Sequence, residues 1–168
     1  MSRTPLRVMP LDGDHERASF SSDSEPLDRY FQQQVTQDTR RRVAACFVAV
    51  TDEQRIAGYY TLAATSLLLA ELPADLGKKL PRYPSVPAIR MGRLAVDQAF
   101  RGQGLGGALL ADALVRCVRS EIAAFALMVD AKHELAAGLY LHHGFIALPD
   151  TPLSLFLPLA TVRGSIQR

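Results

Sequence analysis

The feature that most constrains the fold is a glycine-rich turn between a short apolar run and an amphipathic segment. The apolar run ends with the residues Arg93-Leu-Ala-Val-Asp97. The three residues Gln98–Phe100 connect it to the turn, whose sequence is Arg101-Gly-Gln-Gly-Leu-Gly106. Apolar residues then recur at helical spacing over Ala108–Ser120. Backbone N–H groups of such a turn point into one concavity, and the first helical turn adds unpaired N–H groups and partial positive charge. The pattern therefore predicts a strand, a loop and a helix that bind a phosphate or pyrophosphate group.

Two phosphate-binding patterns fit this turn. Gly102, Gly104 and Gly107 match the G-x-G-x-x-G motif of dinucleotide-binding folds, and Asp130 lies about where a ribose-binding acid is expected. Arg101–Gly106 also match R-x-x-G-x-G. More than ninety residues precede the turn and about sixty follow it, which leaves no room for a full doubly wound sheet. The second pattern is therefore favoured. The alternative is that the glycine-rich turn only begins a helix and binds no ligand.

Composition indicates one globular domain spanning residues 1–168. The chain has 168 residues and an apolar content of 48%, which is enough for a well-buried core. Charged residues, Gly or Pro interrupt every apolar stretch before it reaches the length of a membrane span, and residues 1–5 contain no apolar signal core. Cys46 and Cys117 lie in apolar runs and are expected as buried thiols of a reducing compartment. These features predict a cytoplasmic protein without membrane contact.

The hydropathy pattern predicts an alternation of strands and helices. Strands are expected at about 6–9, 43–50, 56–64, 89–96, 124–130, 145–147 and 154–159, and helices at about 26–40, 108–120 and 134–143. Residues 67–87 contain four prolines and are expected as a short helix with loops. Hairpins come first, and two crossovers follow around the glycine turn. This order predicts an α/β fold with a mixed sheet and helices on both faces.

The basic residues are unusual in kind rather than in number. Net charge is only +2, but sixteen of the nineteen basic residues are Arg, and three stand together at Arg40–Arg42. The planar guanidinium binds two phosphate oxygens at once, so this run is consistent with an RNA or phosphate surface. Arg codon preference in a GC-rich genome explains the same composition, and the two interpretations stay open.

Several segments together resemble a known superfamily over nearly the whole chain. The order of elements, Arg93–Asp97, the glycine turn and Leu139-Tyr-Leu-His-His-Gly-Phe145 resemble the GNAT superfamily of acyl-CoA-dependent N-acyltransferases. Within it, the chain resembles the TacT-type toxins of type II toxin–antitoxin pairs. The segments that match this subgroup are Phe20–Phe31, Arg40–Arg42, Ile56–Leu62, Val129–Lys132 and Leu155–Pro158.

The resemblance implies a fold, a co-substrate and site residues. It implies a GNAT fold with a mostly antiparallel central sheet splayed at the cofactor site, and acetyl-CoA as acyl donor. Tyr140 occupies the position of the catalytic tyrosine. The pantetheine arm is expected to pair with the backbone of Leu94, Ala95 and Val96. The pyrophosphate is expected on the main-chain N–H groups of Arg101, Gly102, Gln103, Gly104, Leu105 and Gly106.

The resemblance also implies the acceptor and the partners. In these toxins the acceptor is the α-amino group of aminoacyl-tRNA, a ribbon-helix-helix antitoxin neutralises the toxin, and homodimers are common. Charge clustering beside the expected acceptor cleft predicts a tRNA surface that consists of Arg40, Arg41, Arg42, Lys78, Lys79 and Arg90. A solvated face is the simpler reading of Lys78 and Lys79.

The chemistry is feasible with these residues. An α-amine has a pKa near 8, so a useful fraction is neutral at cellular pH and a strong base is dispensable. A tyrosine can donate a hydrogen bond or proton as the C–S bond breaks. The histidines have no ligand spacing, so no metal is expected. Two alternatives stay open: a GNAT enzyme acting on a small amine or a protein N-terminus, and a catalytically silent GNAT fold that acts as a binding partner.

Overall fold

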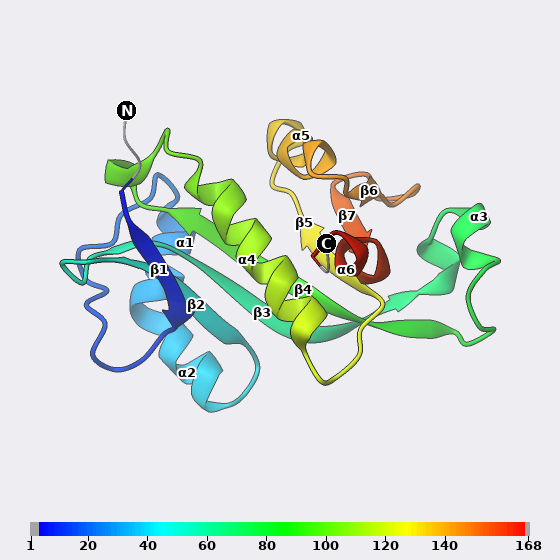
Figure 1. Cartoon of the computed structure of the whole chain (residues 1–168), viewed down its shortest axis with the longest axis horizontal. Helices are drawn as coiled ribbons and strands as arrows, with labels where there is room; N and C mark the ends of the chain where they lie inside the picture. Colours follow the sequence, from blue (N-terminus) through cyan, green and yellow to red (C-terminus); the bar gives the residue numbers. More distant parts are fainter. Residues whose placement is uncertain (1–3, 167–168) are drawn as a thin grey trace. The chain divides into compact units, whose positions relative to one another are not determined.

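The computed structural model describes residues 4–166, shown in Figure 1. The strands are β1 (Leu6–Pro10), β2 (Ala45–Thr51), β3 (Ile56–Leu68), β4 (Ser85–Val96), β5 (Ala126–Asp130), β6 (Ile146–Ala147) and β7 (Ser154–Pro158). The helices are α1 (Glu25–Arg29), α2 (Val35–Arg40), α3 (Ala74–Gly77), α4 (Leu105–Arg119), α5 (Glu134–His142) and α6 (Leu159–Ile166). A π-helical turn, η1 (Tyr30–Gln34), and two 3₁₀ turns, η2 (Leu69–Glu71) and η3 (Gln98–Phe100), complete the elements. Within residues 4–166, no helix combines the length and the apolar character that a membrane crossing requires.

The strands form one mixed sheet. Its hydrogen-bonded order is β1-β2-β3-β4-β5-β7-β6. The β1–β2, β2–β3, β5–β7 and β6–β7 pairs are antiparallel, whereas β4 and β5 run parallel. Parallel neighbours need a crossover connection, and here η3 and α4 provide it. The predicted mixed, mostly antiparallel α/β fold is confirmed.

The chain divides into two compact units. Unit 1 comprises the described residues up to Ala63 together with Gly92–Ala113, and unit 2 comprises Ala64–Met91 with the described residues from Leu114 on.

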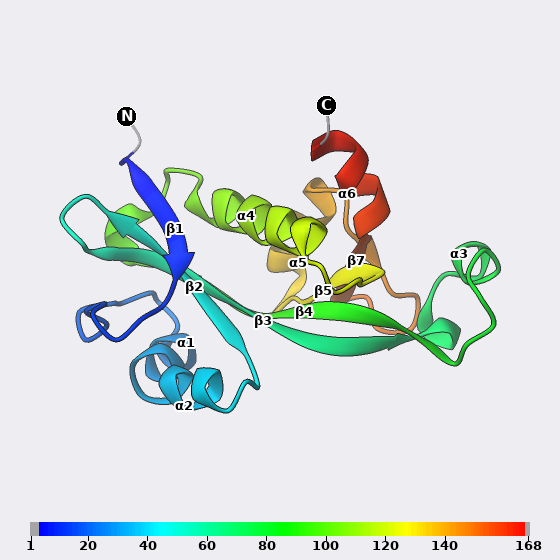
Figure 2. The same ribbon diagram turned by 60° about the horizontal axis from the view of Figure 1, so that its bottom comes forward.

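Both faces of the sheet in unit 1 are covered, as consecutive tyrosines on β3 show. Tyr59 and Tyr60 alternate across the strand and are both fully buried. The Tyr59 ring stacks on Phe31 of η1 at 4.3 Å between centroids, and its hydroxyl donates to the Leu27 carbonyl oxygen of α1. The Tyr60 hydroxyl donates to the Asp112 carboxylate of α4. One face therefore packs under α1–η1–α2 and the other under the first turns of α4, as Figure 2 shows.

The predicted helix over about 26–40 forms, but with a π-helical turn in its middle. Tyr30 and Phe31 are adjacent in sequence, and both are buried in this turn. A regular α-helix directs adjacent side chains about 100° apart, and the wider turn lets both rings reach the core. The helix ends at Arg40, and Arg42, two residues further on, adopts a left-handed conformation with φ of 59°.

In unit 2 the hairpin strands are longer than predicted. β3 continues to Leu68 and β4 begins at Ser85, so part of the expected loop is strand. Leu67 and Val86 are buried in a core with Ala126 and Phe156, and this tertiary burial outweighs the local proline signals. The short helix within the predicted loop is confirmed as η2 and α3. Helix α6 was not predicted; Thr161, Val162 and Gly164 are weak helix formers, so its local sequence gave no signal.

Candidate active site

The end of β4 presents a free backbone edge. The β4–β5 register runs from Ala88↔Ala126 to Met91↔Val129, and β5 ends at Asp130. Within the described residues, β5 therefore has no strand residue left to pair with Leu94, Ala95 and Val96. A strand edge with unpaired N–H and C=O groups accepts an extended, amide-containing chain as an added strand. The pantetheine arm of CoA is such a chain.

The glycine turn that follows has a backbone only glycine adopts readily. Gly102 and Gly104 have φ of 77° and 75°, in the left-handed region. A Cβ placed on Gly102 or Gly106 would meet no atom within 4 Å, so the space over the turn is open. Helix α4 begins at Leu105, directly after the turn. Open space over a left-handed glycine turn at a helix N-terminus is the geometry of an anion-binding site.

Two acidic residues that sequence reasoning left without a role organise this turn. The buried Asp97 carboxylate accepts from the Ser21 and Ala99 backbone N–H groups, each at 2.9 Å. Asp23 forms an ion pair with Arg101 at 2.5 Å. The motif that ends at Asp97 was the available signal for the first; no sequence signal links Asp23 to Arg101.

Tyr140, the predicted catalytic residue, lies on α5 in unit 2. Its side chain is 9% exposed, and its ring meets Phe145 edge to face with centroids 5.6 Å apart. Burial raises the pKa of the Tyr140 hydroxyl above its usual value near 10. The helix that carries it is capped at His133, whose Nδ1 accepts from the Ala136 N–H at 3.1 Å, and ends before Gly144 with φ of 90°. Tyr140 is therefore a fixed, protonated hydroxyl at neutral pH.

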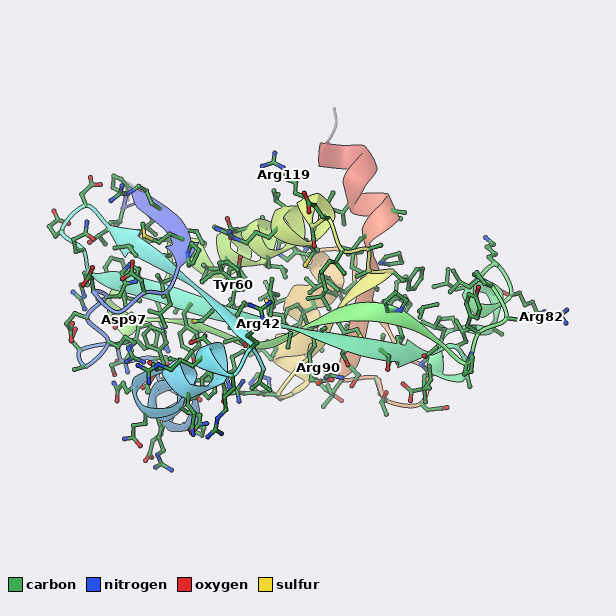
Figure 3. The ribbon with its side chains drawn as sticks, turned by 90° about the horizontal axis from the view of Figure 1, so that it is seen from below. Arg42, Tyr60, Arg82, Arg90, Asp97 and Arg119 are labelled. Atoms are coloured by element: carbon green, nitrogen blue, oxygen red, sulfur yellow. The ribbon has the colours of Figure 1, made fainter. Side chains whose placement is uncertain are left out.

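The residues of the predicted tRNA surface fall into both units. Arg40, Arg41 and Arg42 are exposed at the end of α2 in unit 1, and Lys78 and Lys79 are exposed after α3 in unit 2 (Arg42 is labelled in Figure 3). Arg90 differs from the others because its guanidinium is paired with the Asp130 carboxylate, which also accepts from Ser154 Oγ at 2.7 Å. Because this carboxylate partly neutralises its guanidinium, Arg90 is expected to attract a phosphate less strongly than the other residues of this set.

The remaining candidates take structural roles. The carboxylate of Asp130, the residue that the dinucleotide pattern would assign to a ribose, is bound by Arg90 and Ser154. The thiols of Cys46 and Cys117 are free and buried, as predicted, and burial raises the pKa of each to about 12. Among residues 4–166, no three His, Cys, Asp or Glu side chains form a group that could hold a metal ion.

A comparison with protein families decides the class. Residues 42–147 match the family described as Acetyltransferase (GNAT) domain. The chain belongs to the GNAT acetyltransferases. The match begins at Arg42 and includes the free β4 edge, the glycine turn and Tyr140. It confirms the predicted family and the assignment as an acetyltransferase.

Curated relatives place this GNAT chain near a particular subgroup. It is 35% identical to the "tRNA-acetylating toxin" of Mycobacterium tuberculosis, over 96% of this chain and 95% of the relative. It is 30% identical to the "Probable toxin TacT" of Sinorhizobium fredii, over 93% and 92% of the two chains. The predicted resemblance to TacT-type toxins is confirmed.

Solved structures agree with this placement. AtaT complexed with acetyl-methionyl-tRNAfMet is similar with a TM-score of 0.89 and 28% identity, covering 96% of this chain and 99% of that one. AtaTR bound with AcCoA has a TM-score of 0.82 and 27% identity, covering 96% and 98%. A tyrosine-to-phenylalanine mutant of KacT has a TM-score of 0.87 and 25% identity, covering 95% and 98%.

Proposed function

We propose that this GNAT enzyme transfers the acetyl group of acetyl-CoA to the α-amino group of aminoacyl-tRNA, which blocks translation. The observation that carries the proposal is the free β4 edge at Leu94–Val96 leading into the open glycine turn, in a chain that matches tRNA-acetylating relatives over nearly their full length. The edge supports the pantetheine arm, and the turn and α4 N-terminus support the pyrophosphate.

The transfer is an attack of the neutral amine nitrogen on the thioester carbonyl carbon. A C–N bond forms, the carbonyl oxygen becomes an oxyanion, and backbone N–H groups of the β4 edge stabilise it. The C–S bond then breaks and the amine nitrogen loses a proton to solvent. The thiolate leaves as the hydroxyl of Tyr140 donates to it. Because burial raises the pKa of Tyr140, this hydroxyl acts as a hydrogen-bond donor that keeps its proton at the end of the cycle.

The proposal extends to the chain's organisation and partners. Residues 1–168 work as one GNAT domain in the cytoplasm, the enzyme is a homodimer, and a ribbon-helix-helix antitoxin neutralises it. An antitoxin partner is supported by AtaT, which has been solved bound to the C-terminus of the antitoxin AtaR. The tRNA surface consists of Arg40, Arg41, Arg42, Lys78 and Lys79, with a smaller contribution from Arg90.

The decisive experiment is translation in vitro with and without acetyl-CoA. Aminoacyl-tRNA recovered from each reaction is analysed by mass for an added acetyl group on the aminoacyl ester. We expect inhibition only with acetyl-CoA, together with acetylated aminoacyl ester. Inhibition without that product would refute the assigned acceptor, and acetylation of a polyamine or a protein N-terminus instead would establish the alternative enzyme.

A further inference from the structure

We propose that Asp97 is a positioning residue that shapes the pyrophosphate turn of the acyl-donor site. The inference rests on the proposed function and adds to it a residue that acts through the backbone rather than by touching CoA. Asp97 directly follows the free β4 edge at Leu94–Val96. It lies four residues before Arg101, where the glycine turn begins. Its side chain is labelled in Figure 3.

The Asp97 carboxylate is buried and fully engaged. The residue is 3% exposed. Oδ2 accepts from the Ser21 N–H at 2.9 Å, and Oδ1 accepts from the Ala99 N–H at 2.9 Å and from the Arg55 guanidinium at 3.3 Å. Burying a carboxylate is costly unless charged or backbone donors satisfy it, and these three contacts supply such donors.

Backbone bonds of Asp97 act together with its carboxylate to fix both ends of the segment that precedes the glycine turn. The Asp97 N–H donates to the Ala57 carbonyl on β3, which holds the end of β4. The bond from Ala99 closes η3, and the Phe100 N–H donates to the Asp97 carbonyl at 2.9 Å. Phe100 is then buried under the Arg55 guanidinium, 5.1 Å from ring centroid to Cζ. The backbone therefore enters Arg101 in one defined direction.

The same carboxylate also recruits the N-terminal loop to the turn. Besides the Ser21 bond, the Gln98 N–H donates to the Ser21 carbonyl and the Gln98 amide donates to the Ser22 carbonyl, both at 2.9 Å. Asp23, two residues after Ser21, then pairs with Arg101 at 2.5 Å. Asp97 thus holds the loop whose Asp23 orients the first residue of the pyrophosphate turn.

The replacement Asp97→Asn isolates this role. The amide has nearly the carboxylate's shape, but one oxygen becomes an NH₂ group that cannot accept from Ser21 or Ala99. The backbone N–H of residue 97 still donates to Ala57 in the variant, so we expect the β4 edge at Leu94–Val96 to keep its place and only the pyrophosphate turn to be disturbed. We expect acetyl-CoA affinity to fall about 10-fold or more, because a backbone N–H group of Ser21 or Ala99 loses its acceptor at a buried position.

The test compares two donors. Titration calorimetry measures acetyl-CoA binding without any acceptor, and kcat/KM is measured with acetyl-CoA and with acetyl-pantetheine, which lacks the pyrophosphate. Asp97→Asn is expected to weaken acetyl-CoA binding and to lower kcat/KM for acetyl-CoA, while kcat/KM for acetyl-pantetheine stays within about 2-fold of wild type. Equal losses with both donors, or unchanged acetyl-CoA binding, would overturn the inference.

Two further variants keep the test decisive. Arg55→Met removes one donor to Asp97 from a half-exposed position and is expected to lower acetyl-CoA affinity about 3-fold with the same donor selectivity. Asp112→Asn is the matched control, because it alters a carboxylate of unit 1 that accepts a hydrogen bond from Tyr60. This variant is expected to leave unchanged the ratio of kcat/KM for acetyl-CoA to kcat/KM for acetyl-pantetheine. Failure of wild type to bind acetyl-CoA at all would refute the proposed donor rather than the role of Asp97.

Discussion

At the residue scale, the proposed chemistry depends on the hydroxyl of Tyr140, whose burial keeps it protonated at neutral pH. Tyr140 is nearly buried on α5, and Phe145 packs against its ring. An aromatic near a helix C-terminus is in most proteins a packing residue, and only the resemblance singled out this one. Because the contact with Phe145 is made by the ring, a phenylalanine at position 140 is expected to keep it while removing only the hydroxyl.

We expect Tyr140→Phe to lower turnover by about 10² or more while acetyl-CoA binding stays near wild type, because a donor to the leaving thiolate is lost. Single-turnover acetylation of aminoacyl-tRNA and calorimetric binding measure the two quantities. Phe145→Leu serves as control, since it removes the ring neighbour and leaves the hydroxyl. Near-normal single-turnover rates in Tyr140→Phe would exclude the catalytic role.

The pH dependence of the reaction follows from the same residue. In the proposed mechanism Tyr140 acts in its protonated form, and burial raises its pKa above the usual value near 10. The amine must be neutral, and its pKa is near 8. We therefore expect kcat/KM to rise with pH up to about 8 and then stay level to about pH 9.5. A falling limb below pH 9.5 in single-turnover measurements would show that another acid is required.

At the element scale, β3 approaches β4 and α4 closely. This approach determines the shape of the β4 edge that is proposed to bind the acyl donor. A Cβ on Gly58 would lie 2.9 Å from the Ala95 carbonyl oxygen and 2.9 Å from Leu109 Cδ1. The first of these atoms belongs to the backbone segment expected to receive the pantetheine arm. The strand periodicity predicted β3, but no pattern in the sequence marked Gly58 as the point of closest approach.

We expect Gly58→Ala to destabilise the protein by about 1–3 kcal/mol, because the backbone of β4 must move to admit the methyl group. Acetyl-CoA affinity should fall with it. Gly138→Ala is the matched control: its Cβ meets nothing within 4 Å on helix α5, and it should stabilise by about 0.5–1 kcal/mol. Urea unfolding measures both changes, and a neutral Gly58→Ala would contradict the geometry.

At the scale of the whole molecule, the two thiols report on folding. Cys46 lies in unit 1 and Cys117 in unit 2, both are buried, and burial raises the pKa of each from 9 to about 12. At pH 8 this lowers the thiolate fraction about 10³-fold.

If residues 1–168 form one cooperative domain, both thiols should resist alkylation in the native state and become reactive at the same urea concentration. Mass analysis of peptides labelled along a urea titration measures each site separately. Cys46→Ala and Cys117→Ala, each labelled at the remaining thiol, control for cross-reaction. Two distinct midpoints would show that the units unfold independently.

Charge across the molecule governs the proposed encounter with tRNA. We expect Arg41→Glu combined with Arg42→Glu to weaken tRNA binding at least 10-fold and to reduce its salt dependence, because phosphate contacts release counterions. The control is Arg7→Glu combined with Arg119→Glu, which changes the net charge by the same amount at exposed positions outside the proposed tRNA surface. Filter binding across a salt series compares the pairs. Equal effects of the two pairs, or affinity that does not vary with salt, would rule out a specific arginine surface.

The sequence by itself determined the features that are contiguous along the chain. The glycine turn, the strand before it and the helix after it were predicted because left-handed glycines and helical spacing are local signals, and Gly102 and Gly104 adopt that conformation. The order of elements was likewise readable, apart from the ends of β3 and β4 and helix α6. Tertiary structure alone decided the contacts of Asp97, whose partners Ser21 and Arg55 are 76 and 42 residues away. It also decided that Arg90 is paired with Asp130, and the carboxylate partly neutralises the charge that Arg90 could offer to an RNA phosphate. Such pairings depend on how distant segments approach one another, and no local pattern of residue types encodes that approach.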